Sequence, residues 1–180
     1  MNKKMRMFQA LLIVAILLLQ MIIPIVPIYA KTSENIWKET FENGVDGWKF
    51  FDADGDSDNW NLLNSNESGF KPYRGNYLLA SDSLNRTPDN YAVSPAIDIP
   101  AEKVGDMEAL NLSWYRSALS GYSFAEQYTV YVYKGNSEDP SLNEIKANSE
   151  QIYNETIRYG EEYGKIKIDF TAYKGETIRL

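Results

Sequence analysis

The chain has 180 residues, with 25 acidic and 18 basic side chains, a formal net charge of −7, and neither cysteine nor histidine. These absences exclude Ser-His-Asp triads, Cys-His dyads, zinc centres built on imidazole or thiolate, and haem held by His or Cys. Disulfides, on which small secreted domains often depend, are excluded as well. The acidic balance disfavours nucleic acid as a partner, because a phosphate backbone is bound by clustered Lys and Arg. Cations are more natural binding partners of such an acidic chain than nucleic acid.

Residues 1–30 have the pattern of a secretory signal peptide. Three basic residues lie among the first six, and residues 10–23 are almost entirely apolar. Pro24 and Pro27 follow, just before a small-residue cleavage position at Ala30. This order is typical of a signal that is removed after export. We therefore expect a secreted or cell-surface protein that meets the membrane only transiently; an uncleaved anchor is the alternative, since the apolar run approaches a membrane span in length.

Residues 31–180 are predicted to form one domain made of short β-strands. Tyr, Trp, Phe, Val, Ile and Thr occur in short runs separated by Gly, Pro, Asn, Asp and Ser. In 165–170, for example, Ile166, Ile168 and Phe170 share one face and charged residues share the other. Because no helical crossovers separate the runs, we expect an all-β antiparallel sandwich, with one loop and helical turn at 137–151. The candidate strands are 37–41, 47–52, 60–63, 77–81, 90–94, 109–115, 127–133, 151–159, 164–170 and 177–180.

The strongest local pattern is the acidic segment 52–60, Asp-Ala-Asp-Gly-Asp-Ser-Asp-Asn-Trp. Its four carboxylates at alternate positions would repel one another by about 1 kcal/mol per pair at ~4 Å in water. Calcium prefers six to eight oxygen ligands and would remove that cost, so we expect a calcium loop; a solvated acidic turn is the alternative. An EF-hand is excluded, because its bidentate Glu position is taken by Leu63 and no helices flank the loop. The candidate ligands are Asp52, Asp54, Asp56 and Asp58.

Several further motifs occur in a fixed order along the chain. Phe41-Glu42 is followed by Gly47-Trp48, the acidic loop, a small-residue strand at 77–82 and the segment Pro-Asp-Asn-Tyr-Ala-Val-Ser-Pro at 88–95. A Leu-Ser-Trp-Tyr strand at 112–115 and a Glu-Gln-Tyr-Thr-Val-Tyr-Val-Tyr strand at 126–133 come next. Taken together, this ordered set resembles the cleaved-adhesin family, also met as choice-of-anchor J type domains in the adhesin regions attached to gingipain-type proteases.

The resemblance implies a jelly-roll β-sandwich with structural calcium and a role in adhesion or ligand binding. It matches Glu42 to the first-strand glutamate of the family, which we expect to contact metal, and Asp54, Asp56 and Asp58 to the family's acidic loop. Members of the family usually continue into an aromatic-rich strand and a Leu-Asp-Asp-Val ending. We therefore expect the domain at 31–180 to lack its last strand or strands.

Aromatic residues offer a second kind of candidate site. Trp48, Trp60 and Trp114 are more typical of core packing than of sugar stacking, because aromatic side chains dominate sandwich cores. Three others surround a Ser- and Gly-rich loop and are better placed for an exposed patch. These candidate ligand-binding residues are Tyr115, Tyr122 and Phe124.

The sequence thus predicts a non-catalytic, calcium-stabilised adhesion module that binds an extracellular protein or glycan. The first alternative is a structural accessory domain of a larger secreted enzyme, such as a protease. The second is a glycan-active enzyme, since two carboxylates suffice for glycoside hydrolysis without histidine. Glu126 with Glu155, or Glu161 with Glu162, would supply such a pair, but no motif singles out either.

Overall fold

The structure is a computed structural model that describes residues 35–81, 87–102, 109–118, 125–158, 160 and 162–180. The chain divides into two units, Met1–Thr32 and Ser33–Leu180, and all described residues belong to the second. The predicted signal peptide at 1–30 therefore lies outside the described residues. Within them, no helix has both the length and the apolar character needed to cross a membrane.

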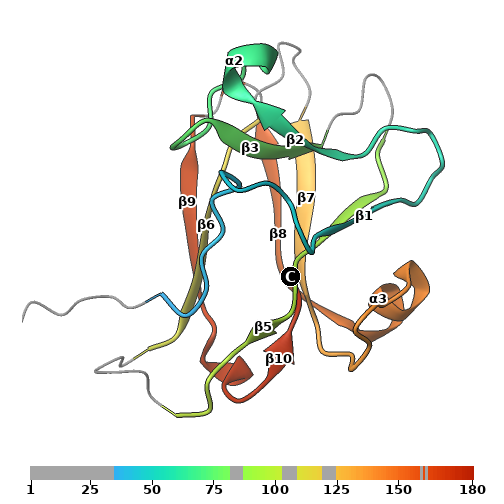
Figure 1. Cartoon of the computed structure of the whole chain (residues 1–180), viewed down its shortest axis with the longest axis vertical. Helices are drawn as coiled ribbons and strands as arrows, with labels where there is room; N and C mark the ends of the chain where they lie inside the picture. The colour runs from blue at the N-terminus through green and yellow to red at the C-terminus, as the bar shows by residue number, and fades with distance from the viewer. Residues whose placement is uncertain (1–34, 82–86, 103–108, 119–124, 159, 161) are drawn as a thin grey trace, which may run out of the picture. The chain divides into compact units, whose positions relative to one another are not determined.

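The described part of the chain is an all-β antiparallel sandwich of the jelly-roll type, as predicted (Figure 1). Each predicted strand from 47–52 onward corresponds to an observed one, with ends that differ by at most two residues. The strands are β1 (Lys49–Asp52), β2 (Trp60–Asn64), β3 (Tyr77–Ser81), β4 (Asn90–Val93), β5 (Ile97–Asp98), β6 (Asn111–Arg116), β7 (Ala125–Tyr133), β8 (Ser149–Arg158), β9 (Gly164–Asp169) and β10 (Thr177–Ile178). The helices are α2 (Ser65–Ser68), α3 (Leu142–Asn148) and the 3-10 turn η1 (Thr171–Tyr173).

The strands form antiparallel ladders of two: β1 with β4, β2 with β3, β5 with β10, β6 with β9, and β7 with β8. The β7–β8 ladder is the longest and contains a bulge between Val130 and Tyr131. An isolated bridge between Tyr133 and Arg179 links the end of β7 to the residue after β10. In Figure 1, β6 to β9 run along the long axis and the β2–β3 ladder crosses near their upper ends.

The core follows from the alternation of the strands. In β6 and β9, residues alternate between exposed and partly buried, so that Leu112, Trp114, Ile166 and Ile168 point inward. The main cluster of buried residues is formed by Ile97, Ile99, Leu110, Val132, Phe170, Tyr173 and Ile178. Its members come from both halves of the domain, so the core closes only when distant strands meet.

The strand predicted at 37–41 is wrong. The Glu39 carboxylate accepts hydrogen bonds from the main-chain N–H groups of Thr40 (2.7 Å) and Phe41 (2.6 Å), and Phe41 has a φ of 64°. A left-handed residue breaks the extended backbone that a ladder requires. The prediction also omitted β5, which has only two residues.

An ion pair joins two of the ladders. Arg116 of β6 donates through Nε to Oε2 of Glu155 in β8 (2.8 Å), and its Nη2 contacts Oε1. Tyr128 of β7 donates its hydroxyl to the same Oε2 (3.1 Å), and Trp114 Nε1 donates to that hydroxyl (3.1 Å). The ionic side chains are only 17% and 21% exposed. Arg116 holds the pKa of Glu155 below its usual range, whereas burial raises the pKa of Tyr128.

We predict that Glu155→Gln lowers the free energy of unfolding by about 1–3 kcal/mol at neutral pH, because a largely buried guanidinium loses its carboxylate. The folded-state pKa of Glu155 lies below the unfolded value, so this contribution is present above about pH 4.3 and is lost as the pH falls through the folded pKa. Urea unfolding across this range measures both effects. Glu150→Gln is the matched control: its pair with Lys134 is 3.8 Å long and exposed, so its loss should cost under about 1 kcal/mol. Equal losses would contradict the assignment.

Candidate functional site

The acidic loop between β1 and β2 is shaped by its own carboxylates. Asp52 accepts hydrogen bonds from the N–H groups of Gly55 (Oδ1, 2.7 Å) and Ser57 (Oδ2, 2.9 Å). Gly55 and Ser57 both have positive φ angles, 74° and 73°, which turn the chain back on itself. Asp56 Oδ1 in turn accepts the N–H of Asp58 at 2.9 Å. The loop therefore folds around Asp52 rather than extending into solvent.

This folding brings three of the predicted metal ligands together. Asp52, Asp54 and Asp56 each place a carboxylate oxygen within 4.8 Å of the others. Loss of hydration raises the pKa of Asp54, and the hydrogen bond with Asp52 and the charge of Asp56 raise it further. In contrast, main-chain N–H donors, above all that of Ser57, lower the pKa of Asp52. Asp58 and Glu42 are not members of this group. Three converging carboxylates offer the hard oxygen ligands that calcium prefers.

A fourth oxygen donor lies on the neighbouring strand. Asn90 is the direct cross-strand partner of Asp52 in the β1–β4 ladder, and cross-strand partners share one face of a sheet. Its amide oxygen and nitrogen are buried and have no hydrogen-bond partner in the described part of the chain. An amide oxygen is a calcium ligand, and a buried one without a partner is costly. The donor set around Asp52 thus fits a calcium ion. The Pro-Asp-Asn-Tyr motif contained this residue, but its pairing with Asp52 is visible only in the fold.

Glu42 has a different position. Its Oε1 accepts hydrogen bonds from the main-chain N–H groups of Asn76 (2.8 Å) and Tyr77 (3.0 Å), which lower its pKa. The side chain thereby fixes the loop before β1 to the start of β3. Binding of metal by Glu42 or Asp58 stays a prediction.

The three tryptophans have structural partners. The indole N–H of Trp48 donates to Glu39 Oε2 (3.3 Å), that of Trp60 to the Asn90 carbonyl (3.1 Å), and that of Trp114 to the Tyr128 hydroxyl. All three residues are partly buried. Satisfied indoles in such positions are typical of packing rather than sugar stacking.

Tyr115 lies on the outer face of β6 and is 40% exposed, as predicted for a residue of an exposed patch; its binding of a ligand stays a prediction. Its ring stacks on that of Tyr73 with 3.5 Å between centroids and 11° between planes. Tyr73, which precedes β3, was not predicted, because it belongs to no recognisable sequence pattern. Tyr122 and Phe124 lie outside the described residues.

The carboxylate pairs considered for glycoside hydrolysis gain no support. Glu155 is held by Arg116 with a lowered pKa, which suits an ion pair and not a general acid. Glu161 lies outside the described residues.

Comparison with known proteins gives matches over most of this domain. The family model of the Cleaved Adhesin Domain matches residues 35–174. Gingipain R1 of Porphyromonas gingivalis is 34% identical over 100 residues, which are 52% of this chain and 5% of that protein. Hemagglutinin A of Porphyromonas gingivalis is 30% identical over 109 residues, 57% of this chain and 4% of that protein. The chain therefore spans about one twentieth of the length of such relatives.

Two solved structures have a similar fold. The K1 cleaved adhesin domain of Lys-gingipain from Porphyromonas gingivalis W83 has a TM-score of 0.57 at 28% identity, covering 78% of this chain and 83% of that one. The K2 cleaved adhesin domain of Lys-gingipain has a TM-score of 0.59 at 20% identity, covering 79% and 85%. The second likeness is one of fold alone.

The acidic loop leads to a prediction for the metal-free protein. Asp54→Asn should raise the thermal midpoint in chelator at neutral pH, because it removes one of three like charges. The folded-state pKa of Asp54 lies above the unfolded value. In the unsubstituted protein, protonation of Asp54 at low pH therefore removes the repulsion, and the stability gained in this way is lost as the pH rises through the folded pKa. The rise in thermal midpoint caused by Asp54→Asn should therefore vanish near pH 3, which scanning calorimetry measures. Asp46→Asn, an exposed site outside the group, is the control. A lower midpoint for Asp54→Asn would contradict the repulsion.

Proposed function

The chain belongs to the cleaved adhesin domain family, and from this we propose that it is a secreted or cell-surface adhesion module whose fold is stabilised by calcium. The observation that carries the proposal is the match of the family to residues 35–174, almost the whole of the described domain. The signal-peptide pattern at 1–30 supports an extracellular location. The proposed partner is an extracellular protein or glycan, and the proposed role is binding and not catalysis.

The calcium part of the proposal is supported by the acidic loop. Asp52, Asp54 and Asp56 would hold the ion, with the Asn90 amide oxygen as a neutral ligand from the neighbouring strand. A bound cation would neutralise the repulsion between the carboxylates and fix the β1–β2 loop to the β1–β4 ladder. In a chain without disulfides, such a link substitutes for a covalent one.

A structural accessory role is the second candidate, and one observation favours it. The matched segment is about 5% of the length of Gingipain R1 and Lys-gingipain. A domain that is so small a part of a long chain can serve to space or support other domains. The two candidates differ in one measurable property, since an accessory domain would bind no external partner.

The first experiment measures calcium binding through stability. Calcium at 100 times its dissociation constant should add about 2.7 kcal/mol to the free energy of unfolding, a rise of several degrees in the thermal midpoint. Asp54→Ala combined with Asp56→Ala should abolish the rise, and Asn90→Ala should reduce it. Differential scanning fluorimetry with calcium and with chelator records both. Asp98→Asn is the control, because this aspartate bonds to Thr177 away from the acidic loop. If calcium left the midpoint of the parent unchanged, the calcium part would be wrong.

The second experiment tests adhesion itself. Beads coated with the purified protein should adhere to an immobilised extracellular-matrix preparation, and soluble protein should compete the adhesion away. Albumin-coated beads are the control. Because calcium orders one loop of the fold, chelator should weaken the adhesion. Absence of adhesion to matrix proteins and glycans alike would reject the adhesion role and leave the accessory role.

A further inference from the structure

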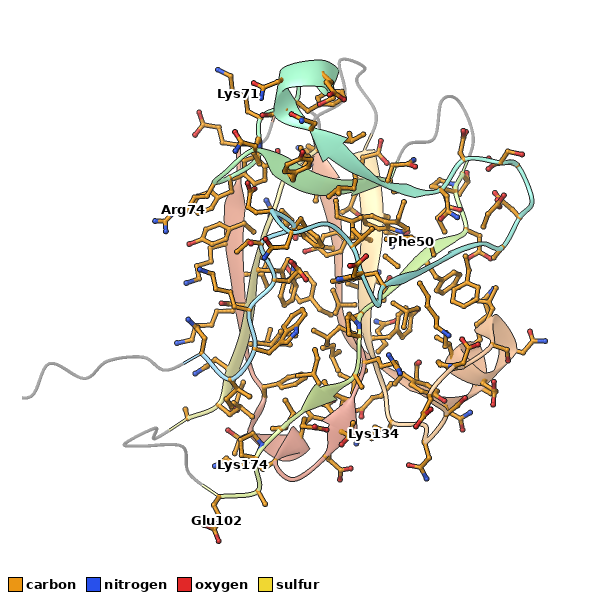
Figure 2. The ribbon with its side chains drawn as sticks, viewed as in Figure 1. Phe50, Lys71, Arg74, Glu102, Lys134 and Lys174 are labelled. Carbon is orange, nitrogen blue, oxygen red and sulfur yellow. The ribbon has the colours of Figure 1, made fainter. Side chains whose placement is uncertain are left out.

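A cluster of exposed aromatic and cationic side chains surrounds the stacked pair Tyr73 and Tyr115. The two residues remain 42% and 40% exposed although their rings lie face to face. The ring of Tyr163 lies 5.9 Å from that of Tyr73 at an interplanar angle of 60°. We call this cluster, with Arg74 and Lys165, the tyrosine platform. It combines the bend before β3 with the outer faces of β6 and β9, and Figure 2 shows Arg74 beside the upper part of β9.

The two cations of the platform are unlike other cations that lie over aromatic rings. Lys134 lies over Tyr173 and Lys146 over Tyr91, but each also has a carboxylate partner, Glu150 and Asp89 respectively. Arg74 lies 5.6 Å from the centre of the Tyr73 ring, and Lys165 lies 5.6 Å from that of Tyr115.

Among the described residues, neither Arg74 nor Lys165 has a carboxylate within ion-pair distance. Glu42 reaches the chain beside Arg74 but bonds to the N–H groups of Asn76 and Tyr77. Both positive charges of the platform are therefore available to a ligand, in a chain whose net charge is −7.

This arrangement selects a chemical class of ligand. Exposed tyrosine rings suit the apolar face of a sugar ring, and an arginine fork suits a planar carboxylate. A nucleic acid would also offer rings and anions, but its charge density of about one per 1.7 Å meets repulsion from the acidic remainder of the chain. A polysaccharide with one carboxylate in each repeat has far sparser charge. The platform therefore complements a carboxylated polysaccharide better than a nucleic acid.

We propose that the tyrosine platform binds a carboxylated polysaccharide, with a uronate ring against the exposed tyrosines and its carboxylate paired with Arg74 and Lys165. This inference rests on the proposed adhesion role and names the ligand class for it. The ion pair forms at the surface, so binding weakens as salt is raised. The stacking contact does not depend on charge and sets the position of the sugar ring.

Titration calorimetry of the purified protein with a hyaluronan hexasaccharide tests the proposal. The hexasaccharide should bind, and an uncharged chitin hexasaccharide should bind at least roughly ten-fold more weakly, since a charge-assisted hydrogen bond is worth about that factor. Arg74→Ala and Tyr73→Ala should each weaken hyaluronan binding by roughly ten-fold or more. Both positions lie in a bend outside the ladders, and the thermal midpoint verifies that each variant is folded.

Matched controls separate the platform from surface charge and exposed tyrosine in general. Lys174→Ala removes a cation at the opposite end of the domain from Arg74 (Figure 2), and Tyr131→Ala removes a tyrosine that is 37% exposed on β7. Neither should change the affinity.

Two results would overturn the proposal: no binding of the hexasaccharide, or binding that Tyr73→Ala and Arg74→Ala leave unchanged. If coated beads adhere to matrix while either result is found, the adhesion role stands and this inference alone fails.

Discussion

Contacts between ladders hold this domain together, because the regular main-chain ladders join its strands in pairs. Within the described residues, main-chain hydrogen bonds link one ladder to another through the segment after β10. Tyr133 and Arg179 exchange hydrogen bonds of 2.9 and 3.0 Å, and the N–H of Ser94, after β4, donates to the carbonyl of Leu180 (2.9 Å). The remaining links are apolar packing and a few directed polar contacts. Arg116 of the β6–β9 ladder pairs with Glu155 of the β7–β8 ladder. The indole N–H of Trp60 in β2 donates to the Asn90 carbonyl in β4. Such contacts are sensitive to single substitutions, because each depends on one pair of residues.

Charge is segregated on the surface of the domain. The acidic loop gathers carboxylates between β1 and β2. The tyrosine platform instead presents Arg74, in the bend before β3, and Lys165, on β9, and neither has a carboxylate partner among the described residues. The first arrangement suits the proposed cation, and the second suits the proposed anionic ligand. The loop is built on the β1–β4 ladder through Asp52 and Asn90, so the proposed ion would act on the stability of the fold rather than by contact with a ligand at the platform.

The sequence predicted what depends on near neighbours in the chain. Alternation located the strands from β1 onward, except β5, and alternate aspartates indicated the grouping of Asp52, Asp54 and Asp56. It did not predict contacts made through space: Asn90 opposite Asp52, or Tyr73 stacked on Tyr115. Apolar and aromatic residues at 37–41 indicated a strand. The structure has none there, because the Glu39 carboxylate accepts the Phe41 N–H and Phe41 has a left-handed φ. Neither feature has a signature in residue periodicity.

The pairing of strands also orders the events by which the domain folds. β5 pairs Ile97 with Ile178 of β10, and β6 pairs Asn111 with Asp169 of β9, so the ladders around the main core join segments far apart in the chain. Closing such long loops costs entropy before any contact repays it, which makes folding slow. Until residues 177 and 178 are available, Ile97 and Ile99 lack the partners that bury them. A chain that is threaded through a membrane from its N-terminus, as the proposed export requires, thus remains unfolded for most of its passage and completes its core on the far side.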